Sequence, residues 1–146
     1  MDGADDFVDN FHTCLVLKNL AKIWAVTQAD DVLAAIRAGY DFYLGHLLDE
    51  RGRPLPFARR PRLTLHRRDL YDYAEGINLA MLLRNEIPAA SDVSRRFLDD
   101  LVERWILPDG HFVTRELVIG RNTIPYHRWA QAQVFHALVR VAASRS

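Results

Sequence analysis

The sequence is poor in cysteine and has no long hydrophobic run, and these absences exclude several classes of protein. Cys14 is the only cysteine in the 146 residues, so no disulfide can form within the chain. Because it lies in an apolar stretch, we interpret it as a buried small side chain rather than a nucleophile. No apolar run approaches the ~18 residues of a membrane span, and residues 1–6 are acidic where a secretory signal would be basic. We therefore expect a soluble cytoplasmic protein.

The sequence also lacks an excess of either charge and any recognisable cofactor motif. The 19 basic residues balance 19 acidic ones, which gives no electrostatic reason to expect nucleic acid or an anionic membrane as a partner. The histidines share no metal-ligand spacing, and no glycine-rich phosphate loop is present. We predict no metal site, no cofactor and no membrane insertion. The length and the hydrophobic content of 49% are typical of one globular domain, residues 1–146.

A helix with a polar start lies near the end of the sequence. Pro125 is suited to open it, because the missing N–H group of proline would have no partner in the first turn. From Trp129 onward, apolar side chains occupy more than one face, which predicts a helix buried on nearly all sides. Its polar groups gather at the N-terminal end, where free backbone N–H groups and the helix dipole favour anions. The pattern predicts an inner helix with a hydrogen-bonding mouth.

Two earlier helices begin in the same way, so the sequence contains a repeat. The polar residues 9–13 and 69–75 precede apolar runs, and the three starts, near positions 9, 69 and 126, are spaced by roughly 60 residues. Outer helices at 32–48 and 93–105, each followed by a glycine turn, separate them. This order predicts an all-α fold, a partial α/α toroid of helical hairpins with about five helices. Short β-hairpin connections are expected, one of them between residues 111 and 119.

The three polar starts are expected to converge at one end of the toroid, because its inner helices run in the same direction. Carboxylates and amides bind sugar hydroxyls, aromatic rings stack on sugar rings, and arginine binds acidic groups. We therefore predict a glycan pocket at this end. Its expected binding residues are Asn10, Tyr71, Asp72, Glu75, Tyr126, Arg128, Trp129 and Gln131.

Asp9, His12 and Asp69 are our candidate catalytic residues in this pocket. One carboxyl group whose pKa is raised by burial, beside another that stays ionised, is the arrangement that glycosidic chemistry uses. The same aspartates can instead be helix caps, and His12 a capping or core residue. Arg128 either binds an acidic substrate or forms a structural ion pair. Trp129 is either a core residue or a platform for a sugar ring.

Two of the polar starts resemble motifs of a known family. Residues 9–13 (Asp-Asn-Phe-His-Thr) resemble the DNFHTG motif, and residues 126–132 resemble the Y-x-R-W-G-Q-A motif, of bacterial polysaccharide-biosynthesis proteins of the VpsJ type. The resemblance implies an α/α toroid, similar in architecture to sugar epimerases, unsaturated glucuronyl hydrolases and polysaccharide lyases. The middle motif departs from the family's Asp-x-His-x-x-x-Gln pattern, because Tyr71 and Glu75 replace its His and Gln. The chain is similar to the C-terminal part of the family's ring.

The resemblance leads to two functional hypotheses. In the first, the chain is a carbohydrate-active or carbohydrate-binding module of bacterial exopolysaccharide or capsule biosynthesis, and its partner is an oligo- or polysaccharide that can be acidic. If it is an enzyme, its reaction is that of a hydrolase, a lyase or an epimerase. In the second, it is a non-catalytic half-ring whose apolar helix edges pair with another copy or with an N-terminal partner chain that completes the ring.

Overall fold

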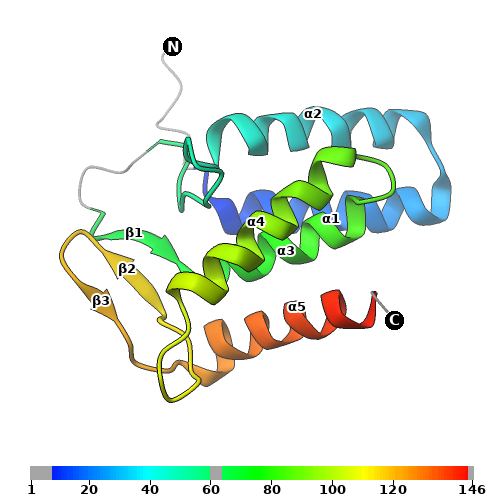
Figure 1. Ribbon diagram of the computed structural model, residues 1–146. Coiled ribbons are helices and arrows are strands. Elements are labelled where there is room, and N and C mark those ends of the chain that lie inside the picture. Colours follow the sequence, from blue (N-terminus) through cyan, green and yellow to red (C-terminus); the bar gives the residue numbers. More distant parts are fainter. Residues whose placement is uncertain (1–7, 60–63, 145–146) are drawn as a thin grey trace, which may run out of the picture.

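The computed structural model describes residues 8–59 and 64–144, and most of them are helical (Figure 1). The predicted all-α fold of about five helices with short β connections is confirmed. Two boundaries differ from the prediction. The second outer helix begins at Pro88 rather than near residue 93, since proline at the first helical position needs no partner for an N–H group. The last inner helix begins at His127 rather than at Pro125. The α-helices of the described part are α1 (Asn10–Thr27), α2 (Asp30–His46), α3 (Leu70–Leu83), α4 (Pro88–Arg104) and α5 (Ala132–Ala143), and a π-helical turn, η1 (His127–Gln131), leads into α5.

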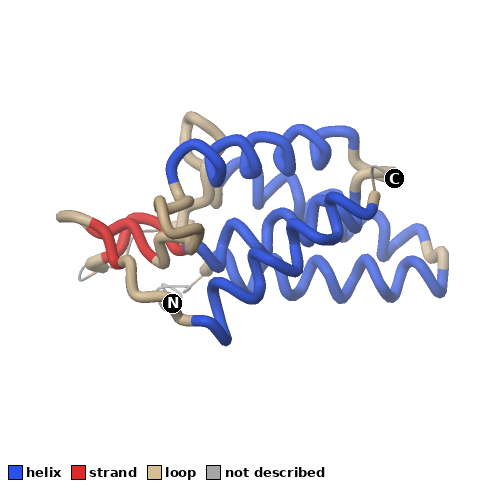
Figure 2. The backbone as a smooth tube through the Cα atoms, turned by 60° about the horizontal axis from the view of Figure 1, so that its bottom comes forward, coloured by secondary structure: helices blue, strands red, loops and turns tan. Residues whose placement is uncertain are grey.

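The helices form an inner layer of α1, α3 and α5 and an outer layer of α2 and α4. α3 lies between α1 and α5 and packs on α4, whereas α2 packs on α1. All three inner helices start at the end of the molecule where the strands lie, and they run away from it (Figures 1 and 2). The polar starts of the inner helices therefore meet at one end of the molecule, as predicted.

The core of the fold is centred on α3, the most buried helix of the described part. Gly76 is required at its middle, because the ring of Phe97 from α4 and the hydroxyl of Tyr43 from α2 occupy the space of a side chain. A Cβ atom at this position would lie 2.4 Å from Phe97 Cε2. The missing side chain lets α3 approach α4 closely and leaves room for the hydroxyl of Tyr43.

The backbone confirms the predicted repeat. α2 and α4 have 17 residues each, and their connections to the next inner helix are built alike. Each connection is closed by a backbone hydrogen bond of 2.8 Å, across residues 47–55 in the first and 105–113 in the second. Each turns at a glycine with a positive φ, 72° at Gly52 and 89° at Gly110, which residues with a side chain rarely adopt. The repeating unit is an outer helix, its connection and the start of the next inner helix.

A small antiparallel sheet joins the two connections. Its strands lie in the order β1 (His66–Asp69), β2 (Arg115–Leu117) and β3 (Arg121–Asn122), and Asp69 pairs with Arg115. The predicted hairpin of residues 111–114 with 116–119 was wrong in register, because the chain turns at Gly120, where φ is 79°. The correction places Arg115 beside the start of α3.

α1 and α5 are not buried on nearly all sides, which corrects the prediction from their apolar faces. Val26 of α1 is 85% exposed and Phe135 of α5 is 68% exposed. Among the described helices, α1 and α5 each have α3 as their one inner neighbour, and no outer helix packs along α5. The apolar side chains on their remaining faces therefore lie at the surface.

Candidate functional site

Asp9 and Asp69 are the N-caps of α1 and α3, so the helix-cap interpretation is confirmed for both. Asp9 accepts a hydrogen bond of 2.7 Å from the backbone N–H of His12, and its second oxygen lies 2.7 Å from His12 Nδ1. Asp69 accepts a hydrogen bond of 2.9 Å from the backbone N–H of Tyr71 and one of 2.6 Å from Arg115 Nε. Each aspartate thus satisfies a helix start with one oxygen and binds a basic side chain with the other.

Asp72, in the first turn of α3, differs from these caps because it is buried and unpaired. Asp72 is only 5% exposed, and its Oδ2 atom has no hydrogen-bond partner among the described residues. Burial, and next the carboxylates of Asp69 and Asp9, raise the pKa of Asp72 well above its ordinary value. The carboxyl group therefore remains neutral at pH values where an exposed aspartate is ionised.

Glu75 lies one turn further along α3 and is 3% exposed. Its carboxylate forms an ion pair with Lys18 of α1, so it joins two inner helices. Glu75 lines neither of the two clefts that open at the helix starts. Glu75 therefore joins two inner helices and does not line the predicted glycan pocket.

Three aromatic rings, one from each inner-helix start, form a row across the mouth. The ring centroids of Phe11 and Tyr71 are 5.1 Å apart, and those of Tyr71 and Trp129 are 6.5 Å apart with their planes at 74°. Trp129 is 68% exposed, so the interpretation of it as a core residue is wrong. The row presents an aromatic surface of the kind that sugar rings stack on.

Two adjoining clefts flank this aromatic row. The inner cleft has a volume of about 260 Å³ and the outer cleft about 350 Å³, and both are lined by Asp69, Tyr71 and Trp129. We call the two together the mouth groove. The inner cleft is further lined by Asp9, Phe11, Pro56, Phe57, His66 and Asp72. The outer cleft is further lined by Thr114, Arg115, Tyr126 and Ala130. The structure thus brings together six of the predicted site residues: Asp9, Asp69, Tyr71, Asp72, Tyr126 and Trp129.

The predicted amide residues, Asn10 and Gln131, hold the connections instead of lining the groove. Asn10 is fully buried, and its Nδ2 donates hydrogen bonds of 3.3 Å and 2.9 Å to the backbone oxygens of Leu47 and Leu55. The side chain of Gln131 accepts from Phe112 N at 3.0 Å and donates to Phe112 O at 2.7 Å. The side chains of Asn10 and Gln131, each at the start of an inner helix, therefore bind the backbone of a connection: Asn10 the one that follows α2, and Gln131 the one that precedes α5.

His12 lies outside the mouth groove, and the side chain of Arg128 lies outside the described part of the structure. The side chain of His12 is 67% exposed and lines a separate apolar groove along α1 and α2. Arg128 lies in η1, but its side chain is outside the described part of the structure. The cation that contacts Asp69 is Arg115, which the sequence did not single out. Only the pairing of β1 with β2 brings Arg115 beside Asp69.

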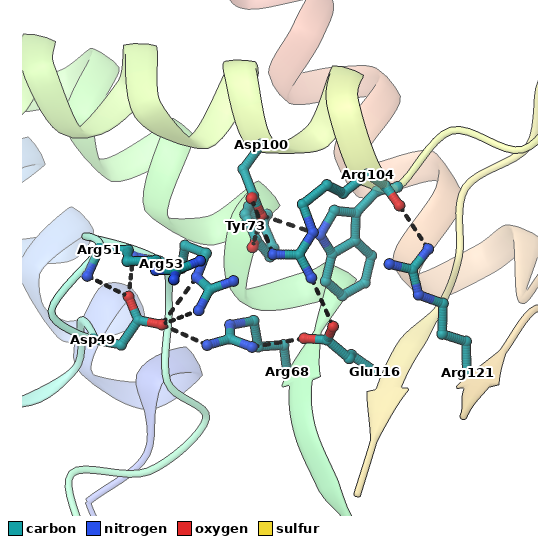
Figure 3. Close-up of polar contacts among 10 residues, drawn as sticks. Asp49, Arg51, Arg53, Arg68, Tyr73, Asp100, Arg104, Glu116 and Arg121 are labelled. Atoms are coloured by element: carbon teal, nitrogen blue, oxygen red, sulfur yellow. Dashed lines mark hydrogen bonds and ion pairs between the residues drawn. The ribbon is translucent and has the colours of Figure 1, made fainter. Parts of the chain in front are cut away.

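A network of charged side chains fixes the sheet that carries Asp69 and Arg115 (Figure 3). Arg68 of β1 lies between Asp49 of the first connection and Glu116 of β2, with Nη1 2.6 Å from Glu116 Oε2. Glu116 also binds Arg104 at the end of α4, at 2.8 Å. On the other side, Arg53 binds Asp49 at 2.9 Å. The groove therefore rests on a sheet that is tied to both connections and to α4.

The described residues contain no group of three or more His, Cys, Asp or Glu side chains arranged to hold a metal ion. Across the same residues, no helix combines the length and the apolar character needed to cross a membrane. Among the described side chains, those that line the mouth groove offer carboxyl groups, aromatic rings, hydroxyl groups, the imidazole of His66 and the guanidinium group of Arg115, which contacts Asp69.

The helical layers and their converging starts define an α/α toroid architecture, and a solved structure supports this. The chain is similar to a GH76 α-mannanase from Bacteroides thetaiotaomicron, with a TM-score of 0.68 and 14% sequence identity. The similarity covers 99% of this chain and 46% of the mannanase chain, so this chain spans about half the length of that structure. No protein-family model and no curated protein sequence matches the chain. At this identity the likeness shows the fold, and the resemblance to VpsJ-type proteins stays a prediction.

Proposed function

We propose that this chain is a carbohydrate-binding or carbohydrate-active toroid module whose glycan lies in the mouth groove. The observation that carries the proposal is the joint presence in one groove of exposed rings and carboxyl groups from different inner-helix starts. Tyr71 and Trp129 would contact sugar rings, while Asp9 and Asp69 would accept hydrogen bonds from hydroxyl groups. The α-mannanase to which the fold is similar acts on a glycan, which agrees with this proposal.

The finer parts of the proposal follow from the sequence resemblance. It implies a place in bacterial exopolysaccharide or capsule biosynthesis, and a hydrolase, lyase or epimerase reaction if the chain is an enzyme. Asp9 and Asp69 remain the candidate catalytic groups, since both line the inner cleft; His12 contacts Asp9 from outside it. Arg115 adds a cation at the outer cleft, where an acidic sugar would meet it.

Calorimetric titration with α-linked manno-oligosaccharides and with acidic oligosaccharides tests this function. We expect Trp129→Ala to weaken binding by at least tenfold, because a lost ring contact is worth about 1.4 kcal/mol or more. Phe135→Ala is the matched control, since its ring is equally exposed, at 68%, but lies on α5 outside the groove. Equal affinities of the two variants, or no binding of any glycan by the folded protein, would contradict the proposal.

A second candidate function is a half-ring that pairs with another copy or completes a partner toroid. The exposed apolar side chains of α1 and α5, such as Val16 and Phe135, favour it, as does the match to 46% of a longer toroid chain. Light scattering tests the dimer, which would have twice the 16.8 kDa of one chain. A dimer that Phe135→Glu dissociates would support this function. This function is contradicted if the protein is a monomer at all concentrations and its mass also stays the same when the N-terminal half of a longer toroid chain is added.

A further inference from the structure

Asp72 is the one groove-lining carboxyl group whose contacts within the described residues do not explain its position. Asp9 and Asp69 each cap a helix and bind a basic side chain, whereas Asp72 Oδ2 is buried without a hydrogen-bond partner. Buried polar groups in folded proteins are almost always paired, and an unpaired one costs stability. Asp72 lines the inner cleft beside Trp129, so a ligand in that cleft is the candidate partner for this carboxyl group.

The charged groups around Asp72 determine its protonation state. Asp9 at the start of α1, and Asp69 and Glu75 on its own helix, are acidic neighbours. The nearest cations are engaged elsewhere, since Arg115 of β2 binds Asp69 and Lys18 of α1 binds Glu75. Tyr43 of α2 and Cys14 of α1 also interact with Asp72, and the pKa values of both are raised, first by burial, so both stay neutral and add no negative charge.

His66 completes the surroundings, because it lines the same cleft from β1. Burial, and next Arg115, lower its pKa, so its ring is neutral at neutral pH. Tyr71 also carries a pKa raised first by burial, and is neutral there. Asp72 therefore faces two carboxylates in the cleft, neutral rings, and no unpaired cation among the described side chains.

We propose that Asp72 is a protonated carboxylic acid that donates a hydrogen bond to an acceptor oxygen of an uncharged sugar in the inner cleft. This inference rests on the proposed glycan function and names the substrate class of that site. A carboxylic acid has one O–H donor, so it suits a ring or glycosidic oxygen, which has no proton to give. Asp9 and Asp69 supply the acceptors for the sugar hydroxyls. An acidic sugar is disfavoured in this cleft, because its carboxylate would lie beside two others, and the described side chains offer no free cation there.

The first experiment needs no ligand, so it separates the protonation of Asp72 from the glycan function. The infrared spectrum of the protein at pH 7 should contain the carbonyl band of a buried protonated acid, and Asp72→Asn should remove it. Asp99→Asn, which changes an exposed aspartate of α4, is the control and should leave the band in place. A spectrum in which Asp72→Asn removes no such band overturns the inference, whatever the protein binds.

The second experiment measures the affinity for α-linked mannobiose and for a diuronate by calorimetry between pH 5 and pH 9. Over the pH range in which the infrared band of Asp72 disappears, we expect the wild-type affinity for the neutral disaccharide to fall at least tenfold. Asp72→Asn, whose amide donates a hydrogen bond at every pH, should bind within threefold of wild type at pH 5 and show a flat profile. Loss of the band without a fall in wild-type affinity, binding by Asp72→Asn at pH 5 that is more than tenfold weaker, or tighter binding of the diuronate overturns the inference. The infrared band without binding of either sugar instead overturns the glycan function, and with it the ligand named here.

Discussion

Replacing Lys18 by methionine should destabilise the fold far more than replacing its partner Glu75 by glutamine. The two side chains form an ion pair between α1 and α3, in which the Lys18 side chain is 16% exposed and the Glu75 side chain only 4%. Loss of the lysine leaves a carboxylate buried in the inner layer without a cation. Loss of the carboxylate charge leaves a lysine whose long stem can carry its ammonium group to water.

The magnitudes follow from this difference in burial. Removing one partner of a buried pair costs about 3–5 kcal/mol, and we expect about 3 for Lys18→Met because the pair is partly open to solvent. Glu75→Gln should cost about 1 kcal/mol, since glutamine still accepts a hydrogen bond from Lys18. The double variant Lys18→Met with Glu75→Leu should lie within about 1 kcal/mol of wild type, because a buried pair is often replaceable by apolar side chains.

Urea unfolding followed by circular dichroism measures these differences as shifts in midpoint at constant slope. Lys22→Met is the matched control, because Lys22 is exposed on the same helix, and its variant should change stability by less than about 0.5 kcal/mol. The reasoning is refuted if Lys18→Met costs no more than Lys22→Met. It is also refuted if the double variant is destabilised by as much as Lys18→Met alone.

Three further predictions concern the connections and the helices. Gln131→Ala should lower the free energy of unfolding by about 1–2 kcal/mol in urea, because it unpairs two backbone groups of Phe112, whereas Gln133→Ala should be near neutral. Burial alone would raise the pKa of Asp49, but hydrogen bonds from Arg53 and Arg68 outweigh it and lower the pKa. The stability from Asp49 is therefore complete above the unfolded pKa and lost as the pH falls below about 4, so thermal unfolding of Asp49→Asn should depend less on pH in that range, and an unchanged dependence would contradict this. Gly45→Ala should raise the thermal midpoint, since a side chain there meets no atom and alanine favours the helix by up to ~1 kcal/mol, whereas Gly52→Ala should lower it because of the positive φ.

The parts of the fold that the sequence predicted correctly are set by local signals. Asp9 and Asp69 cap the helices they precede, and a short acidic side chain at such a position acts within a few residues. Gly52 and Gly110 mark the two connections, because each turn needs a backbone conformation that other residues avoid. Inner and outer helices then follow from the order of these signals along the chain.

The errors concern contacts between residues far apart in the sequence. Arg115 reaches Asp69 across 46 residues through strand pairing, and the register of that pairing depends on where the chain turns at Gly120. The exposure of Trp129 depends on which helices pack against α5, and an apolar face does not tell how many neighbours cover it. Neither property is encoded within a window around the residue.

The residues at the inner-helix starts meet two different requirements, those of the fold and those of a ligand. Asn10 binds the backbone of the first connection and Gln131 that of the second, so the fold alone accounts for an amide at these positions. The fold does not account in this way for an exposed indole at Trp129 or for an unpaired acid at Asp72. The amides therefore argue for the toroid fold, whereas the exposed indole of Trp129 and the unpaired acid of Asp72, which cost solubility or stability, argue for a ligand. Substitutions at Trp129 and Asp72 should accordingly change binding while the fold persists, and substitution of Gln131 should do the reverse.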